Sequence, residues 1–124
     1  MATQKVLIVE DSEDNREVLK HIIQYIGYEV LEAVNGKQAV EIFKDQHPDL
    51  ILMDLSMPVL DGYGAVREIR DLDEIGEVPI VAVSAHETVD HRVKALAIGF
   101  NEYLTKPIDF EELRGVILRF LEPE

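Results

Sequence analysis

Short runs of apolar residues recur along the chain, separated by longer segments in which apolar and polar positions follow a helical spacing. The clearest runs are residues 6–9, 50–53, 80–83 and 103–105. They are rich in Val, Ile and Leu without regular polar alternation, which is typical of strands buried on both faces of a parallel sheet. The pattern therefore predicts a parallel sheet that helices cover on both sides.

The longer segments carry apolar residues three and four positions apart, which predicts amphipathic helices. The positions that mark five helices are Val18, Leu19, Ile22, Ile23 and Ile26; Ala39, Val40, Ile42 and Phe43; Tyr63, Val66 and Ile69; Val89, Val93, Leu96 and Ala97; and Phe110, Leu113, Val116, Ile117, Phe120 and Leu121. Ser12 is the expected N-cap of the first helix, and Gly27 and Gly99 are expected to end the first and fourth.

One further strand is predicted over residues 28–33. It carries Glu29 and Glu32, which favours a position at an edge of the sheet. The chain then contains five strand–helix units, which predicts one α/β domain over residues 1–124 with right-handed crossovers. The expected architecture is a doubly wound five-stranded parallel sheet of flavodoxin-like (βα)5 type, with strand order 2-1-3-4-5.

Residues with metal or phosphate chemistry follow the apolar runs. Glu10 and Asp11 follow the first run, Asp54 the second, Ser84 the third, and Lys106-Pro107 the fourth. In open α/β sheets the ligand crevice lies beyond the carboxyl ends of the strands, so these groups are expected to meet there. Any one of the acidic residues alone is explained more simply as a helix cap or a solvated loop residue, but the set predicts a site.

Three carboxylates in one crevice require a compensating charge. At about 5 Å and an effective dielectric near 20, each pair repels by roughly 3 kcal/mol. A proton retained on one carboxyl group, or a bound cation, would relieve this repulsion. A hard divalent ion suits oxygen ligands, and Mg2+ is the natural choice.

Asp54 is singled out because it follows the central strand directly. A carboxylate can act as a nucleophile towards phosphorus and form an acyl phosphate, with catalysis resting on positioning and charge neutralisation. Lys106 and the Ser84 hydroxyl could then bind the phosphoryl oxygens. The Lys106-Pro107 peptide bond is expected to be cis, which would re-aim the lysine.

The composition narrows the class of protein. The chain has 124 residues and a net charge of -13, which disfavours nucleic acid and anionic membranes because both bind basic surfaces. It has no cysteine, and therefore neither a disulfide framework nor a thiolate metal site. No apolar run approaches the roughly 18–20 residues of a membrane span, and the first residues do not form a signal-peptide pattern. We therefore expect a cytoplasmic protein.

Four segments in this order resemble the receiver domain of the two-component response-regulator family. They are Val6-Leu7-Ile8-Val9-Glu10-Asp11; Asp49-Leu50-Ile51-Leu52-Met53-Asp54-Leu55-Ser56-Met57-Pro58 with Asp61-Gly62; Val83-Ser84-Ala85; and Tyr103-Leu104-Thr105-Lys106-Pro107. The resemblance covers essentially the whole chain. It implies that Asp54 accepts a phosphoryl group from a phosphohistidine of a histidine kinase or a histidine phosphotransfer protein.

The resemblance also implies roles for the surrounding residues. Asp11, Asp54 and the backbone carbonyl of Ser56 would ligate Mg2+, with Mn2+ as an alternative and Glu10 acting directly or through water. Ser84 would be the switch hydroxyl, Ala85 would offer its backbone N–H to the phosphate, Lys106 would pair with the phosphate, and Tyr103 would be the aromatic switch. Glu10 replaces the commoner aspartate, and Ser56 and His86 occupy positions where the family tunes the lifetime of the phosphate.

The expected output is a change of surface rather than catalysis of an external reaction. A phosphoryl group on Asp54 would draw in the Ser84 hydroxyl, and the Tyr103 ring would turn from an exposed to a buried position. The surface of the fourth helix, fifth strand and fifth helix would then bind a downstream protein. The protein would be a signalling switch that only transfers and removes its own phosphoryl group, as a monomer or a weak phosphorylation-linked dimer.

Other functions remain open at this stage. An aspartyl-phosphate phosphatase would normally carry a second carboxylate at the position of Ser56, and an FMN carrier would not place Glu10 and Asp11 in its phosphate loop. A phosphorylation-independent binding module would usually lack the aspartate or the lysine. The chain is either a stand-alone regulator, which its first and last residues favour, or a receiver cut from a larger regulator or hybrid kinase.

Overall fold

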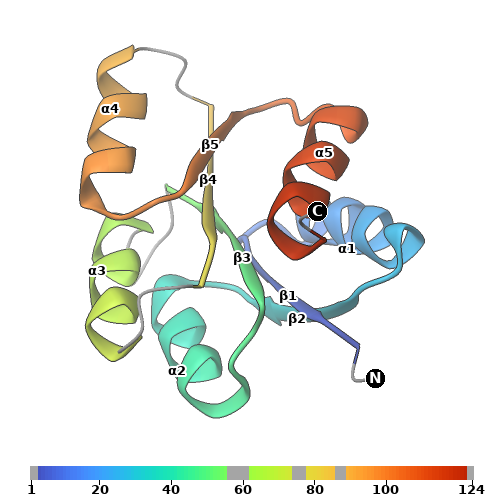
Figure 1. Ribbon diagram of the computed structural model, residues 1–124, viewed down its shortest axis with the longest axis horizontal. Helices are drawn as coiled ribbons and strands as arrows, with labels where there is room; N and C mark the ends of the chain where they lie inside the picture. The colour runs from blue at the N-terminus through green and yellow to red at the C-terminus, as the bar shows by residue number, and fades with distance from the viewer. Residues whose placement is uncertain (1–2, 56–61, 74–77, 86–88, 123–124) are drawn as a thin grey trace.

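The computed structural model describes residues 3–55, 62–73, 78–85 and 89–122, with residues 89–91 described in their backbone alone. Strands and helices alternate throughout this part of the chain (Figure 1). They are β1 (Lys5–Val9), α1 (Glu13–Ile26), β2 (Glu29–Ala33), α2 (Gly36–Gln46), β3 (Leu50–Asp54), α3 (Gly62–Leu72), β4 (Ile80–Ser84), α4 (Val89–Ile98), β5 (Glu102–Thr105) and α5 (Phe110–Leu121). None of these helices is long and apolar enough to cross a membrane.

The strands form one parallel sheet in the order β2-β1-β3-β4-β5. The predicted doubly wound order is therefore confirmed, and β2 with its two glutamates lies at an edge. The register aligns the carboxyl ends: Val9 of β1 lies opposite Met53 of β3, and Asp54 lies opposite Val83 of β4. The residues that follow these positions consequently reach the same edge of the sheet.

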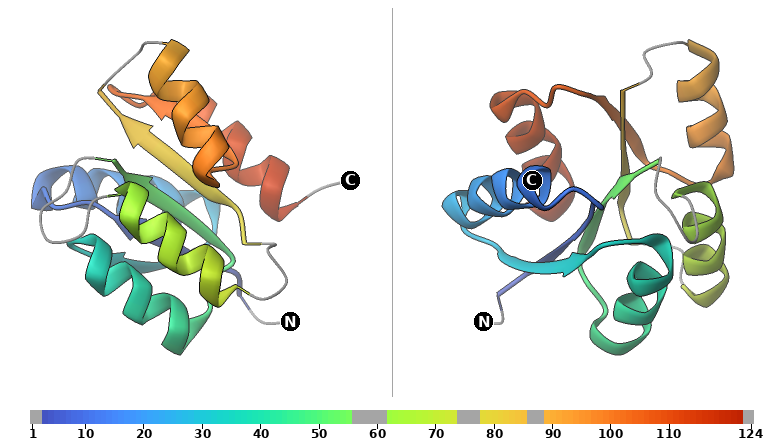
Figure 2. Two further views of the ribbon diagram at one scale, coloured as in Figure 1. Left: turned by 90° about the vertical axis from the view of Figure 1, so that its left-hand side faces the viewer. Right: turned by 180° about the vertical axis from the view of Figure 1, so that it is seen from behind.

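Helices cover the two faces of the sheet in unequal numbers. Figure 1 shows α1 and α5 on one side and α2, α3 and α4 on the other, and Figure 2 shows these three helices side by side. Each face has its own apolar cluster, one joining the sheet to α2, α3 and α4 and the other joining it to α1 and α5. The strands β1, β3 and β4 contribute to both clusters, which is why their apolar residues do not alternate with polar ones.

The predicted helix ends are confirmed. The Ser12 hydroxyl accepts a hydrogen bond from the Asn15 amide at 3.3 Å, as an N-cap does. Gly27 and Gly99 follow α1 and α4 with φ angles of 119° and 140°, in the left-handed region where a side chain is strained. Local sequence therefore determines where these helices begin and end.

Helix α4 packs through a different face from the one its large apolar residues suggest. Val93 and Leu96 are 58% and 44% exposed, whereas Ala95 is fully buried against the sheet. The prediction of a helix is confirmed, but Val93 and Leu96 lie on its outer side, whereas Ile98 packs against the core. A small residue at the contact lets the helix backbone lie close to the sheet.

Candidate functional site

Three carboxylates meet at the carboxyl edge of the sheet. Glu10 and Asp11 follow β1, and Asp54 is the last residue of β3. One carboxylate oxygen from each residue lies within 4.8 Å of the others. Glu10 and Asp54 are 2% and 6% exposed, while Asp11 faces solvent. The predicted convergence of these residues is therefore confirmed.

Lys106 lies between two of these carboxylates. Its Nζ donates to Asp54 Oδ2 at 3.0 Å and to Glu10 Oε1 at 3.1 Å. Its backbone amide donates to the Ser84 carbonyl at 2.8 Å, which ties the end of β5 to the end of β4. The Lys106-Pro107 peptide bond is cis, as expected from the sequence. The lysine thus supplies one positive charge to two buried negative charges.

Burial and neighbouring charges change the pKa values of two groups in the site. Burial, together with a hydrogen bond that the Asp11 carboxylate accepts and the charge of Asp54, raises the pKa of Glu10, although hydrogen bonds from the Ser12 amide and Lys106 oppose this effect. Burial alone would lower the pKa of Lys106, but the hydrogen bonds and charges of Asp54 and Glu10 raise it overall. The two neighbouring carboxylates therefore favour the ammonium form of Lys106.

Ser84 and Ala85 lie at the same edge. Ser84 ends β4, is 2% exposed, and lies opposite Thr105 in the register with β5. Ala85 follows it and faces solvent. Both residues therefore lie at the carboxyl end of the strand that pairs with β3, as the sequence predicts. Ser56 and His86, for which the sequence suggests a role in phosphate lifetime, lie outside the described residues.

Tyr103 differs from the expectation that its ring starts in an exposed position. It is 2% exposed and belongs to the apolar cluster beneath α2, α3 and α4. The Arg92 guanidinium lies over the ring at 5.2 Å and pairs with Glu102 at 3.7 Å. The cation over the ring and the surrounding apolar side chains both stabilise the inward position.

Gly62 lies in close contact with the strand that ends in Asp54. A Cβ at this position would lie 2.6 Å from the Asp54 carbonyl oxygen and 2.8 Å from Leu55 Cα. The Gly62 amide also donates to the Leu55 carbonyl at 3.4 Å. A glycine is therefore required for α3 to begin this close to Asp54.

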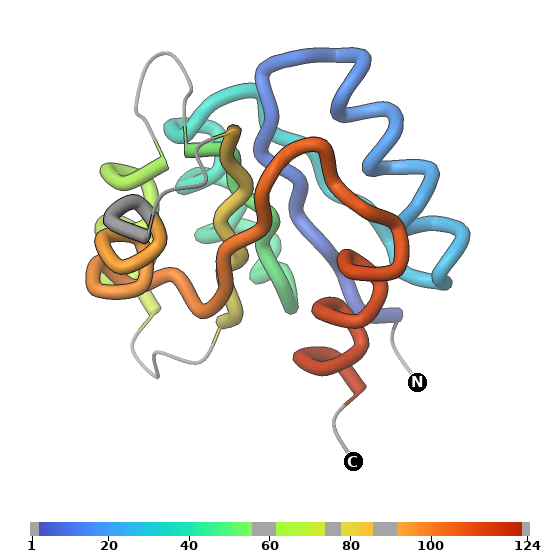
Figure 3. Tube along the Cα trace, turned by 90° about the horizontal axis from the view of Figure 1, so that it is seen from above, coloured from blue at the N-terminus to red at the C-terminus, as the bar shows by residue number. Residues whose placement is uncertain are grey.

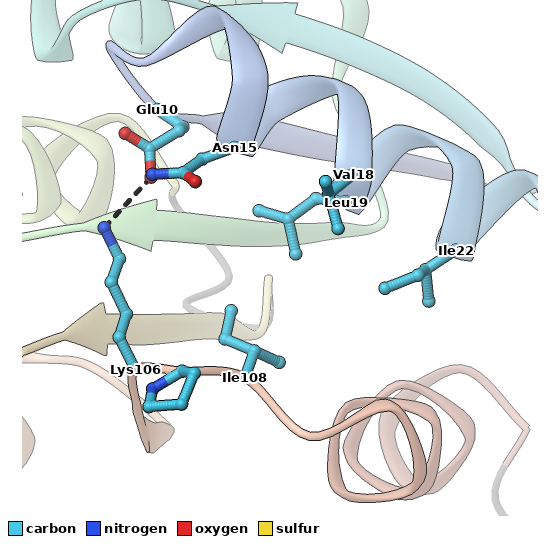
Figure 4. A pocket seen from close by; sticks show the side chains of 8 residues that line it. Glu10, Asn15, Val18, Leu19, Ile22, Lys106 and Ile108 are labelled. Carbon is cyan, nitrogen blue, oxygen red and sulfur yellow. Dashed lines mark hydrogen bonds and ion pairs between the residues drawn. The ribbon is translucent and has the colours of Figure 1, made fainter.

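An open groove of about 480 Å3 extends from Glu10 and Lys106 between α1 and the segment after β5. Figure 3 shows this segment running beside the first turns of α1, and Figure 4 shows Val18, Ile22 and Ile108 lining the groove next to the Lys106–Glu10 ion pair. Val18 is one of the apolar positions that mark the first helix in the sequence, and its side chain is 58% exposed. Helical periodicity marks both Val18 and the buried Leu19 as apolar, and does not distinguish the groove from the core.

The donor atoms suit a hard divalent cation. The clustered ligands among the described residues are carboxylate oxygens from Glu10, Asp11 and Asp54, with neither imidazole nor thiolate among them. Oxygen ligands of this kind favour Mg2+, Mn2+ or Ca2+ over softer transition metals. The residues present therefore fit Mg2+.

The fold and the site together define a doubly wound α/β protein with a carboxylate and lysine centre at the switch point of its sheet. The comparison with known families agrees, since the model of the response regulator receiver domain matches residues 6–118. The chain therefore belongs to the response regulator receiver domain family of two-component signalling systems. Receiver domains of this family act as signalling switches.

Known relatives and solved structures are similar to the chain over nearly its whole length. The chain is 38% identical over 117 residues to a probable transcriptional regulator, ycf27, of Porphyridium aerugineum, covering 94% of this chain and 48% of that protein. It is 40% identical, with a TM-score of 0.88, to the receiver domain of the sensor histidine kinase PA1611 from Pseudomonas aeruginosa PAO1, covering 96% and 98% of the two chains. The crystal structure of that domain has a magnesium ion coordinated in its active-site cleft.

A third similar structure is the chemotaxis protein CheY4 of Vibrio cholerae, which is 31% identical with a TM-score of 0.90 and covers 97% and 100% of the two chains. By contrast, the chain spans about half the length of ycf27. Relatives of the chain are therefore found both as small proteins and as parts of larger ones.

Proposed function

We propose that Asp54 accepts a phosphoryl group from a phosphohistidine of a histidine kinase or a histidine phosphotransfer protein. The observation that carries this proposal is the position of Asp54, which ends the central strand β3 within hydrogen-bond distance of Lys106 and beside the carboxylates of Glu10 and Asp11. The carboxylate oxygen of Asp54 would attack phosphorus while the N–P bond of the donor breaks. The donor nitrogen leaves with the electron pair and takes up a proton, and an acyl phosphate remains on Asp54.

Several residues around Asp54 would together neutralise the charge of the phosphoryl oxygens. The ammonium of Lys106 has three N–H donors. Lys106 would turn one of them from a carboxylate oxygen to a phosphoryl oxygen. Ser84 and the backbone N–H of Ala85 would bind further phosphoryl oxygens from the end of β4. Such preorganised donors contribute most where the site excludes water, and Asp54 is 6% exposed.

Mg2+ is the proposed cofactor, with Mn2+ as the alternative. Glu10, Asp11, Asp54 and the backbone carbonyl of Ser56 would hold it, with Glu10 acting directly or through water. When bound, the ion would neutralise charge on the phosphoryl oxygens and on the three carboxylates. The clustered oxygen ligands support this assignment.

The groove beside Lys106 is where the phosphodonor would approach. Its lining combines apolar Val18, Ile22 and Ile108 with the polar end formed by Glu10 and Lys106. An apolar groove that ends at the nucleophile suits a helix carrying an exposed phosphohistidine. Val18→Asp should therefore reduce phosphotransfer from a histidine kinase while labelling by acetyl phosphate stays normal.

The proposed output surface is α4, β5 and α5, which would bind a downstream protein. Arg92 links the buried Tyr103 ring to Glu102, and Glu102 also pairs with Arg119 of α5 at 2.6 Å. A movement of Tyr103 would therefore change contacts on this surface. Because Tyr103 is buried, we expect a change of its packing rather than a new burial.

The direct test is phosphorylation of the purified protein with acetyl phosphate and Mg2+, followed by mass spectrometry. The wild-type protein should gain one phosphoryl group, and Asp54→Asn should gain none. Asp49→Asn is the matched control, since Asp49 accepts a hydrogen bond from the Lys5 amide at 2.7 Å away from the cluster. Equal labelling of the Asp54 variant would refute the proposal.

Several parts of this proposal concern the whole protein. We propose a single receiver domain over residues 1–124 that acts in the cytoplasm as a monomer or a weak phosphorylation-linked dimer. The alternatives are a receiver that belongs to a longer regulator or hybrid kinase, and a binding module that acts without phosphorylation. An Asp54→Asn strain should lose signalling if the main proposal is correct, and should keep it if the protein is a binding module that acts without phosphorylation.

A further inference from the structure

Arg16 connects three elements next to the acidic cluster. It lies in the second turn of α1, and its side chain is 16% exposed. Its Nη1 donates to the Glu10 carbonyl oxygen at 3.0 Å, and its Nε donates to Glu32 Oε1 at 3.3 Å. One guanidinium therefore spans the end of β1 and the edge strand β2, which its rigid fork of donors allows.

The hydrogen bond from Arg16 is made to the backbone of Glu10, which is a proposed metal ligand. The Glu10 amide donates to the Ala33 carbonyl at 3.1 Å, and the Glu10 carboxylate accepts from the Ser12 amide at 3.1 Å and from Lys106. Arg16 provides the hydrogen bond to the remaining polar group of this residue, its carbonyl. The position of the Glu10 and Asp11 backbone thus depends on Arg16 as well as on the sheet.

We infer that Arg16 is a positioning residue for the divalent cation: it fixes the peptide from which the Glu10 and Asp11 carboxylates project. This inference rests on the proposed metal site. Arg16 carries a positive charge and cannot itself ligate a cation, so its contribution is made through Glu10. Glu32 holds the guanidinium in place, and Lys20 pairs with the other oxygen of Glu32 at 3.5 Å.

Charge and position predict opposite effects for the removal of Arg16. If Arg16 acted only through its charge, its loss would make the cluster more negative and Mg2+ would bind more tightly. If Arg16 positions the ligands, its loss should weaken binding even though a positive charge has been removed. The sign of the change in affinity therefore separates the two explanations.

The experiment is a titration of the full chain with Mg2+ alone, followed through the amide signals of residues 10–12 by NMR. Arg16→Ala should weaken Mg2+ binding about tenfold, the usual size for a residue that orients a metal ligand. Arg16→Lys keeps the charge but loses the fork, so it should weaken binding by a smaller factor of about three. Lys20→Ala is the matched control, because it removes one charge beside Glu32 without contact to Glu10, and it should bind Mg2+ as tightly as the wild type or more tightly.

A second measurement examines the metal-free protein. Hydrogen exchange of the Glu10 and Ser12 amides should be faster in Arg16→Ala than in Lys20→Ala, because only the first variant loses the hydrogen bond to the Glu10 carbonyl. Normal or tighter Mg2+ binding by both Arg16 variants would overturn this inference and leave the metal site intact. Absence of Mg2+ binding by the wild-type protein would overturn the proposed site and the inference together. If Arg16→Ala does not fold, the result for Arg16→Lys decides.

Discussion

The ammonium of Lys106 lies 3.0 Å from a carboxylate oxygen of Asp54, although 52 residues separate the two along the chain. The same ammonium is 3.1 Å from Glu10. In the metal-free protein, Lys106 therefore occupies the position of a counter-ion for two buried carboxylates. A divalent cation at the cluster would compete with Lys106 for the same negative charge.

Lys106→Met should destabilise the metal-free protein and strengthen its binding of Mg2+. Loss of the ammonium removes a positive charge from beside the buried carboxylates of Glu10 and Asp54, at a cost of about 2 kcal/mol, below the 3–5 kcal/mol typical of a fully buried pair. The cost is lower because the Lys106 side chain is 29% exposed and solvent screens its charge. Urea unfolding with EDTA and with Mg2+ measures both effects, and Lys20→Met on the surface of α1 should change stability by less than about 0.5 kcal/mol. Unchanged stability and unchanged Mg2+ affinity in Lys106→Met would contradict this account.

Asp11→Ala should stabilise the metal-free protein and weaken Mg2+ binding. The carboxylate oxygens lie within 4.8 Å of one another, and two charges about 5 Å apart repel by about 1 kcal/mol in a water-like dielectric and by about 3 kcal/mol at an effective value of 20. Asp11 faces solvent, so we expect a gain of about 1 kcal/mol. Asp14→Ala in the first turn of α1 is the control, because it loses only a favourable helix-dipole interaction and should be slightly destabilising. Unfolding by urea in EDTA should therefore give opposite signs for the two variants, and equal signs would refute repulsion within the cluster.

Gly62→Ala should destabilise the protein by about 1–3 kcal/mol, because the new Cβ would overlap backbone atoms that cannot easily move. The nearest atom is the Asp54 carbonyl oxygen at 2.6 Å, so phosphorylation of Asp54 by acetyl phosphate should also slow. Gly115→Ala in α5 is a matched control with no atom within 4 Å of its Cβ, and it should stabilise the helix by about 0.5–1 kcal/mol. Thermal unfolding of both variants tests this contrast. A Gly62→Ala protein as stable as Gly115→Ala would show that α3 can move away from Asp54.

Ser84→Ala should still accept a phosphoryl group but should respond to it weakly. The proposed nucleophile and metal ligands remain, whereas the hydroxyl at the end of β4 that would follow the phosphoryl group is lost. Beryllofluoride, which imitates an acyl phosphate, should shift amide signals over residues 84–103 in the wild type and much less in the variant. A full response in Ser84→Ala, or a wild-type response confined to the loops around Asp11 and Asp54, would contradict the proposed switch.

Tyr28→Phe should remove part of the loss of stability at alkaline pH. The Tyr28 hydroxyl donates to Glu122 at the end of α5, and burial followed by this contact raises the pKa of Tyr28 to about 12. Its pKa is near 10 in the unfolded chain, so the contribution of Tyr28 is complete below about pH 10 and is lost as the pH rises to about 12.

The free energy of unfolding lost through ionisation of Tyr28 should reach at most about 2–3 kcal/mol, which is the equivalent of a pKa shift of about two units. Urea unfolding at about pH 8 and about pH 11.5 measures it. Tyr25→Phe is the control, since Tyr25 is 83% exposed. Its free energy of unfolding should match that of the wild type at both pH values. An equal alkaline loss in Tyr28→Phe would refute the contribution of this hydroxyl.

The sequence alone determined the order of the elements and the identity of most site residues. Apolar runs without alternation define central parallel strands, and Glu29 and Glu32 mark an edge strand, because these properties depend on strand period and solvent exposure. Once the strand order is known, the parallel arrangement brings Glu10, Asp54 and Lys106 to one edge of the sheet. Each of these steps needs only the local pattern and the rules of topology.

Tertiary structure decided which side of each helix faces outward and which distant side chains touch. The apolar pattern alone did not show that Val18 and Val93 are exposed, since burial of a helical residue depends on the elements that pack against it. The buried Tyr103 ring beneath Arg92, and the contacts of Arg16 with Glu10 and Glu32, likewise join residues on different elements of the fold. No sequence spacing encodes such contacts, because they arise only when the sheet is complete and its two layers of helices are in place.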